Sequence, residues 1–232
     1  DNPLRHSVDS AESPVSAMTH HILAVAGPDA KKDVVRELAS GATKRVMFTR
    51  TKHQAKRLAK QLTAAGVPAV DLHGNLTQPA RERNLTAFSS GAVRVLVATD
   101  IAARGIHVDD VDLVVHVDPP AEHKAYLHRS GRTARAGAGG NVVTVMLPEE
   151  AGDVRTLTRR AKITATPVRV QPGDATVQQL VGDVAPYVAP AAPAPQHQTA
   201  GRGGGRGRQG GSAGGRGRAA GGAQGAGQGG GR

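Results

Sequence analysis

Six short apolar runs, rich in β-branched residues, recur between residues 17 and 170. In chain order they read HHILAV (20–25), RVMFTR (45–50), VPAVDL (67–72), VRVLVAT (93–99), VDLVVHVD (111–118) and NVVTVMLP (141–148). Several are almost continuously apolar, which is typical of parallel strands that helices cover on both faces. The pattern predicts six strands of one buried sheet.

Amphipathic segments separate these runs. The segment 51–66 carries an apolar stripe at helical spacing and ends on a glycine, which favours a helix stop. The stripe consists of Ala55, Leu58, Ala59, Leu62 and Ala65. In the segment 77–91, Thr77 is suited to cap a helix, and Leu85 and Phe88 are suited to face inward. This alternation predicts right-handed βαβ units, so the fold class is α/β with a parallel sheet flanked by helices.

Composition divides the chain into three parts. Residues 1–16 are polar and contain prolines, which indicates a lead-in or an inter-domain linker. Residues 17–168 form the predicted folded domain, and residues 169–232 form a tail that is first Pro/Ala-rich and then Gly/Arg-rich. Residues 201–232 hold 17 glycines and six arginines, so no apolar surface offsets the entropy of ordering them. We expect a disordered tail.

The composition also excludes several classes of site. The chain has no cysteine and no H-E-x-x-H, so neither a disulfide framework nor a metal site is predicted. No apolar run reaches the roughly 18 residues that span a bilayer, and the first residues lack the plan of a signal peptide. We expect a cytoplasmic protein without a membrane partner. Because it begins with Asp1, we also expect a piece of a longer chain.

The formal net charge is +11, and it is unevenly distributed. After Asp183 the sequence has six arginines and no acidic residue. Such an excess points to a polyanionic partner, nucleic acid first, although a basic surface without a function is the simpler alternative. For the tail the two hypotheses are an RNA tether and a solubilising segment.

Two polar clusters are expected at the ends of strands, where open parallel sheets bind their ligands. TDIAARGIHV (99–108) begins with a threonine hydroxyl beside an expected helix start, which suits phosphate. HRSGRTARAG (128–137) places Arg129, Arg132 and Arg135 within seven residues. Arg132 and Arg135 are three apart, so one helical turn would aim both at a phosphate; the alternative is a capped turn with solvated arginines. No phosphate-cradling G-x-x-x-x-G-K-[ST] loop occurs in the 232 residues.

These segments carry a resemblance to a known family. RVMFTRTK, LHGNLTQPAR, ATDIAARGIHV, VHVDPP and YLHRSGRTARAG resemble, in order and spacing, the second RecA-like domain of DEAD-box RNA helicases. In that family they would be motif IV, the Q-x-x-R motif, motif V, the D-x-P turn and motif VI. The similarity covers about residues 17–165. His128 at the start of motif VI favours the RNA branch over the related DNA translocases, which usually carry Gln there.

The resemblance implies an ATP site between two RecA-like domains. The first domain, absent from this sequence, would supply the phosphate loop and the carboxylates for Mg²⁺. Arg132 and Arg135 match the arginine fingers, which stabilise the charge of phosphoryl transfer. Gly105 and His107 fall at nucleotide-binding positions.

Further roles follow from the same resemblance. Residues implied to meet the RNA backbone are Gly74, Gln78, Arg81 and Thr99. Residues implied to couple the domains are Arg104, His128 and Arg129. Contacts to phosphate and ribose confer little sequence preference.

Two positions depart from the family pattern. His107 stands where the family usually has an Asp that contacts the ribose, and imidazole cannot supply the paired acceptors of a carboxylate. Ala134 replaces the usual Gly of motif VI.

The resemblance implies the C-terminal half of an ATP-dependent RNA helicase, whose partners are RNA and the first RecA-like domain of the same parent chain, and which is inactive alone. One alternative is a non-catalytic RNA-binding module, made of an orphan RecA-like domain and a basic tail. Another is a DNA-directed helicase of the same superfamily.

Overall fold

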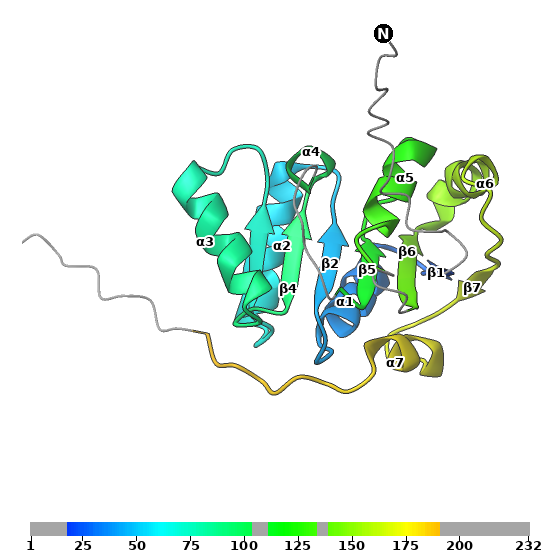
Figure 1. The fold of residues 1–232 in the computed structure, drawn as a ribbon. Helices are drawn as coiled ribbons and strands as arrows, with labels where there is room; N and C mark the ends of the chain where they lie inside the picture. The colour runs from blue at the N-terminus through cyan, green and yellow to red at the C-terminus, as the bar shows by residue number, and fades with distance from the viewer. Residues whose placement is uncertain (1–17, 104–110, 134–138, 191–232) are drawn as a thin grey trace, which may run out of the picture. The chain divides into compact units, whose positions relative to one another are not determined.

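The computed structural model describes residues 18–103, 111–133 and 139–190 (Figure 1). Within them, seven parallel strands form one sheet in the order β3-β4-β2-β5-β6-β1-β7. The strands are β1 (Met18–Ala24), β2 (Arg45–Phe48), β3 (Ala69–Leu72), β4 (Val95–Ala98), β5 (Leu113–His116), β6 (Gly140–Met146) and β7 (Pro167–Arg169). All six predicted strands are present, and the predicted α/β class is confirmed.

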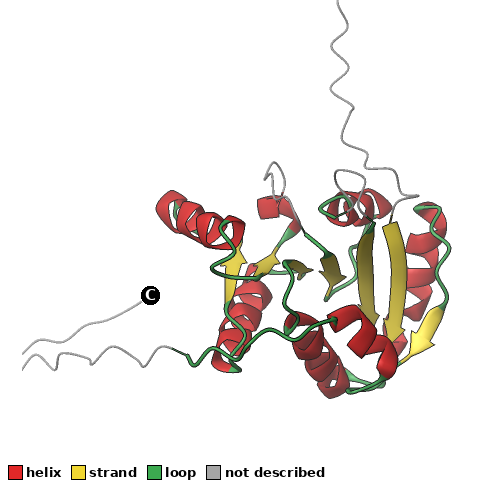
Figure 2. Ribbon diagram, turned by 60° about the horizontal axis from the view of Figure 1, so that its bottom comes forward, coloured by secondary structure: helices red, strands yellow, loops and turns green. Residues whose placement is uncertain are grey.

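Helices cover both faces of this sheet (Figures 1 and 2). They are α1 (Pro28–Ala39), α2 (Lys52–Ala64), α3 (Gln78–Ser89), α4 (Asp100–Ala103), α5 (His123–Ser130), α6 (Ala151–Arg160) and α7 (Ala175–Val181), with a 3₁₀ helix, η2 (Pro148–Glu150). Helices α1, α2 and α7 pack on one face, and α3, α4, α5 and α6 pack on the other.

The core is two aliphatic layers, one on each face of the sheet. Neighbouring strand residues alternate between them: Met47 lies in the layer under α1 and α2, whereas Val46 and Phe48 lie in the opposite layer. Every residue of β2, β4 and β5 is buried, which explains why their sequences, apart from Arg45 and His116, are apolar rather than alternating.

The start of α3 and the end of α2 follow the predicted chemistry, whereas the cap at the start of α2 was not predicted. Thr51 caps α2 through a reciprocal capping box with Gln54, and Thr77 caps α3 by accepting from the Ala80 N–H. Gly66 has φ 83°, a left-handed conformation that ends α2 and that residues other than glycine rarely adopt. Of the predicted stripe on α2, Ala55, Ala59 and Leu62 are buried and Leu58 packs partly, whereas Ala65 is exposed.

The prediction of a disordered tail from residue 169 is wrong for residues 169–190. Strand β7 pairs with β1, and Val177 and Val181 of α7 are buried in the core layer beside α1. Residues 183–190, which we call the strap, then run across the amino edge of the sheet (Figure 2). Residues 1–17 and 191–232 lie outside the described residues, so the predicted linker and the rest of the predicted tail stay predictions.

Backbone hydrogen bonds hold the strap. The Ala42 N–H donates to the Asp183 carbonyl at 2.7 Å, the Ala185 N–H to the Ser40 carbonyl at 2.8 Å, and the Val188 N–H to the Gly66 carbonyl at 3.0 Å. Such bonds need no particular side chain, which explains how a Pro/Ala-rich sequence is held without an apolar pattern. Among the described helices, none is long and apolar enough to cross a membrane.

Candidate functional site at the carboxyl edge of the sheet

The carboxyl ends of the central strands are joined in register. The Thr49 N–H, after β2, donates to the Ala98 carbonyl of β4 at 3.0 Å. The Thr99 N–H, after β4, donates to the Leu72 carbonyl of β3 at 3.1 Å, and the Val117 N–H, after β5, donates to the Phe48 carbonyl of β2 at 3.0 Å. The segments that follow β2, β3, β4 and β5 therefore lie side by side at the carboxyl edge of the sheet, and we call this surface the ledge.

Arg129 ties two parts of this site together. Its Nε lies 2.5 Å from Asp100 Oδ1 and its Nη2 lies 2.9 Å from Oδ2, a bidentate pair between α5 and α4. Its Nη1 donates to the Asp118 carbonyl at 2.8 Å, and its guanidinium carbon lies 5.1 Å from the centre of the Phe48 ring. The arginine is 3% exposed. Arg129 therefore holds α5 to α4 and to the turn after β5 within the domain. Its predicted role in coupling domains stays a prediction.

The predicted RNA-binding residues lie on the ledge or on the helix beside it. Arg81, on α3, donates from Nη2 to the Ala102 carbonyl of α4 at 2.7 Å. Thr99 is buried at the start of α4 and lies next to the end of β3 through its backbone bond. Gly74 and Gln78 are exposed, and no atom lies within 4 Å of the place a Cβ on Gly74 would take. The structure thus brings Arg81 and Thr99 to α4, with Gly74 and Gln78 open to solvent nearby in the chain.

The residues of the second polar cluster divide between interior and surface. His128 is exposed, whereas its neighbour Arg129 is buried. Helix α5 ends at Ser130, so Arg132 follows the helix instead of lying on it; its Nε donates to the His128 carbonyl at 3.3 Å. Because Arg135 lies outside the described residues, the prediction that one helical turn aims both arginines at a phosphate stays a prediction.

Several predicted site residues lie outside the described residues. They are Arg104, Gly105, His107 and Arg135; Ala134, which departs from the family pattern, also lies outside them. These residues belong to the segments 104–110 and 134–138. The Thr133 hydroxyl, just before the second segment, donates to the carbonyl of Val111, just after the first. Within the described ranges no three His, Asp or Glu side chains converge as metal ligands.

An ionic cluster at Asp118 was not predicted. Lys31 of α1 is buried, with Nζ 3.7 Å from Asp118 Oδ1 and 3.5 Å from Glu150 Oε2. The Arg50 N–H donates to Asp118 Oδ2 at 3.0 Å. The cluster fixes the turn after β5 against the segment after β2. The only sequence signal was the VHVDPP turn itself, because its partners lie far away in the chain.

Two histidines, His116 fully buried and His20 partly buried, lie beneath α5. His20 Nδ1 lies 3.1 Å from the Tyr126 hydroxyl, and His116 Nδ1 lies 3.2 Å from the Thr144 hydroxyl. The rings of His116 and Tyr126 meet edge to face, 4.5 Å between centres. Burial lowers the pKa of His20 to about 4 and that of His116 well below its usual value, and it raises the pKa of Tyr126 to about 12. Both imidazoles are therefore neutral at pH 7.

Acid should destabilise the domain through these histidines. Because the folded-state pKa of His20 lies below its ordinary 6.5, the unfolded chain gains protons first, and stability falls as pH drops from 6.5 to about 4. The slope from His20 can reach at most about 1.4 kcal/mol per pH unit in that window, and solvent screening of this partly buried ring makes it smaller. Thermal melts against pH should show a shallower acid slope for His20→Asn, and an unchanged slope for the exposed control His53→Asn. Equal slopes in all three proteins would contradict the assignment.

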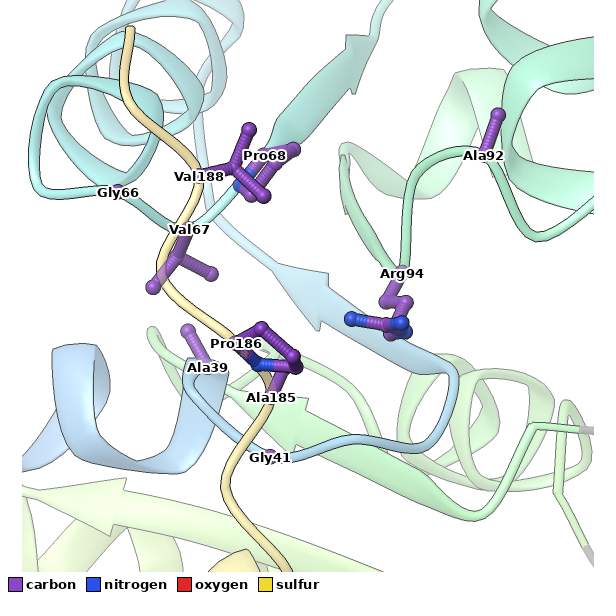
Figure 3. A pocket seen from close by; sticks show the side chains of 10 residues that line it. All are labelled: Ala39, Gly41, Gly66, Val67, Pro68, Ala92, Arg94, Ala185, Pro186 and Val188. Carbon is purple, nitrogen blue, oxygen red and sulfur yellow. The ribbon is translucent and has the colours of Figure 1, made fainter.

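A hollow of about 110 Å³ lies at the opposite edge of the sheet, under the strap (Figure 3). Its lining residues are Ala39, Gly41, Gly66, Val67, Pro68, Ala92, Arg94, Ala185, Pro186 and Val188. The lining is mostly apolar and contains none of the predicted site residues.

Comparison with known proteins agrees with the resemblance seen in the sequence. Residues 30–137 match the family model described as "Helicase conserved C-terminal domain". The ATP-dependent rRNA helicase RRP3 of Mycosarcoma maydis is 41% identical over 150 residues, which are 62% of this chain and 26% of that protein. The DEAD-box ATP-dependent RNA helicase 53 of Oryza sativa subsp. japonica is 42% identical over 122 residues, which are 53% of this chain and 20% of that protein.

Solved structures share the fold of the described domain. E. coli DEAD-box protein SrmB, bound to regulator of ribonuclease activity A, superposes with TM-score 0.62 and 30% identity, over 67% of this chain and 95% of that one. The chain belongs to the DEAD-box RNA helicases. S. cerevisiae Dbp5, bound to RNA and ADP BeF3, gives TM-score 0.64 and 27% identity over 72% of this chain and 46% of that one. The helicase domain present in this protein is the C-terminal RecA-like domain.

This DEAD-box chain spans less than a third of the length of the two curated relatives, 26% of the Mycosarcoma maydis RRP3 and 20% of the Oryza sativa helicase. The ledge holds the segments that resemble motif IV, the Q-x-x-R motif and the start of motif V. The Arg129–Asp100 pair fastens motif VI to motif V, and the Arg81 bond fastens the Q-x-x-R motif to the same short helix.

Proposed function

We propose that this chain is the C-terminal half of an ATP-dependent RNA helicase, which supplies arginine fingers to ATP and part of the RNA backbone-binding surface. The observation that carries the proposal is the fastening of three helicase motifs around α4, by Arg129 to Asp100 and by Arg81 to the Ala102 carbonyl. A domain that must present phosphate-binding groups to two ligands needs such rigid support. The relatives named ATP-dependent RNA helicases support the same function.

The proposed ATP contacts come from this chain's arginines. Arg132 is partly exposed just beyond α5, where its fixed positive charge suits a phosphate, and Arg135 would join it. ATP supplies the transferable phosphoryl group, and Mg²⁺ would be held mainly by the first domain. Gly105 and His107 would contribute to the nucleotide site. His107 can hydrogen-bond one ribose hydroxyl but cannot offer two carboxylate oxygens.

The proposed RNA contacts use the ledge. Gly74 and Gln78 are exposed, and a bare glycine lets a phosphate approach the backbone N–H groups closely. Arg81 and Thr99 would complete the surface from α3 and the start of α4. Arg104, His128 and Arg129 would couple this surface to the first domain. Such contacts recognise phosphate and ribose, so we expect binding with little sequence preference.

The chain by itself should not hydrolyse ATP. Its 232 residues contain no phosphate loop, so no group is expected to cradle the β- and γ-phosphates. Joined to a matching first RecA-like domain, it should become an ATPase that RNA stimulates. Phosphate release by the purified chain and by the joined protein, each with and without RNA, is the measurement. Robust Mg²⁺-dependent ATP hydrolysis by the chain alone would contradict the proposal.

The second candidate is a non-catalytic RNA-binding module, favoured by the missing phosphate loop and the net charge of +11. The same assay separates the two, because a module would stay inactive when joined to a first domain. A DNA-directed helicase would show equal or greater stimulation by DNA than by RNA of the same length.

Removing residues 191–232 should weaken RNA binding and flatten its salt dependence. The cut must fall after Pro190, because the strap is hydrogen-bonded to the domain. The removed segment holds six arginines, and each phosphate contact contributes about 0.7 to the salt slope for single strands. Titration of oligouridine over a salt series measures both quantities. An unchanged affinity and slope would leave the tail a solubilising segment only.

A further inference from the structure

One exposed face of α2 carries positively charged side chains, and no acidic residue of the helix balances their charge. Lys52, Lys56 and Lys60 recur every four residues and so form one row along the helix, and His53 and Arg57 form the row beside it. All five side chains are exposed. The helix contains no Asp or Glu at all. We call Lys56, Arg57 and Lys60, which lie beyond the first turn, the α2 basic face.

The charge on this face is unbalanced within the domain. Among the described residues, no carboxylate lies within 4 Å of a cation of α2. Helix α1 differs, because Lys32 pairs with Asp29 at 2.8 Å and Arg36 with Asp33 at 3.0 Å. Like charges four residues apart destabilise a helix by a few tenths of a kcal/mol per pair. The repulsion along α2 therefore destabilises the helix, and no ion pair among the described residues offsets it.

The α2 basic face leads away from the ledge. Helix α2 starts directly after β2, at the carboxyl edge that carries the proposed RNA contacts, and it ends at the amino edge. From Lys52 to Lys60 the row covers about 12 Å, since the helix rises about 1.5 Å per residue. Just beyond the helix end, the Val188 N–H of the strap donates to the Gly66 carbonyl at 3.0 Å. The sequence then continues past the strap with six arginines.

We infer that the α2 basic face is a second contact surface for the RNA backbone, which holds the part of a single strand that extends beyond the ledge. This inference rests on the proposed function. Lysine ammoniums on flexible stems are suited to phosphates without regard to base sequence. A protein partner is disfavoured, because the core of a protein interface is built on aromatic and large apolar anchors. None of the exposed large hydrophobic residues of the described chain lies on α2.

The test compares two triple variants of the whole 232-residue chain. One is Lys56→Gln/Arg57→Gln/Lys60→Gln. The matched control, Arg155→Gln/Arg159→Gln/Arg160→Gln, removes three exposed cations from α6, on the other face of the sheet. Affinity is measured across a salt series for a short oligouridine that covers only the ledge, and for one several times longer. A thermal melt of each variant checks that it is folded.

We expect the α2 variant to bind the long RNA about tenfold more weakly, with a salt slope smaller by about 2, since each of three lost contacts is worth about 0.7. Its affinity for the short RNA and both affinities of the α6 variant should change less than about twofold.

Equal losses in the two variants, or no loss in the α2 variant, would overturn the inference while leaving the proposed function in place. Failure of the unaltered chain to bind either RNA would contradict the proposed function, and the inference with it. Binding of polyglutamate as tightly as the long RNA, lost in the α2 variant, would assign the face to an acidic protein instead.

Discussion

Arg132→Ala, made in a full two-domain parent, should lower kcat for RNA-stimulated ATP hydrolysis by about 10³-fold while changing RNA affinity far less. Arg135→Ala should do the same. The reason is that a fixed positive charge is most valuable when negative charge shifts on the transferring phosphate, so its loss raises the barrier more than it weakens ground-state binding. The position of Arg132, just past the fastened helix α5, limits where its guanidinium can reach.

The measurement is kcat at saturating RNA and ATP, beside RNA affinity, for each variant. Arg132→Lys should rescue poorly, since an ammonium cannot reproduce the fork of a guanidinium. Arg202→Ala, in the tail sequence, is the control and should leave turnover unchanged. If kcat of Arg132→Ala stays within about twofold, worth under roughly 0.5 kcal/mol of barrier, the arginine-finger assignment is wrong.

The sheet and helices α2 and α3 were predictable because their signals are local. A short run such as VRVLVAT, apolar except for Arg94 and Thr99, is typical of a strand covered on both faces, and β4 is buried at every residue. The capping chemistry of Thr51 and Thr77 lies within three residues of each helix start, so the sequence alone indicates where α2 and α3 begin.

The strap and α7 were missed because what holds them is not local. Arg45, at the start of an apolar run, resembles the edge of a strand, yet it is 2% exposed and donates to the Val181 carbonyl at the end of α7. Burial lowers the pKa of Arg45 to about 10. Gly41 leaves the space for this side chain, because a Cβ there would collide with the guanidinium. A sequence pattern cannot show that residues 45 and 181 meet.

The candidate site, like the fold, could be predicted only where its signals are local. Its residue types could be recognised at the strand ends, but their partners could not. Asp100 precedes Arg129 by 29 residues, and Lys31 precedes Asp118 by 87, so neither pair leaves a trace in spacing. The sequence consequently indicates only a coupling role for Arg129, whereas its contacts within this domain are what the structure adds.

Those contacts make Asp100→Ala a substitution that should strongly destabilise the chain. Removing the carboxylate leaves the Arg129 guanidinium, 3% exposed, with the Asp118 carbonyl and the Phe48 ring as its remaining contacts. Breaking a buried ion pair by deleting one partner typically costs about 3 to 5 kcal/mol. The Asp100 side chain is 40% exposed and partly screened, so we expect a loss of about 2 to 3 kcal/mol in the free energy of unfolding.

Urea unfolding of the chain without a first domain measures this directly, and a loss seen there belongs to the domain itself and not to its coupling with another. Asp33→Ala, which breaks the exposed pair with Arg36, is the matched control and should cost less than about 0.5 kcal/mol. Arg129→Met and the double variant complete a cycle, in which the interaction energy should be at least about 1 kcal/mol and favourable. If Asp100→Ala unfolds at the same urea concentration as the unaltered chain, the pair does not hold motif VI to motif V. The Asp118 carbonyl and the Phe48 ring would then be sufficient to keep Arg129 in place, and the rigid support on which the proposed function rests would have to come from the backbone bonds of the ledge.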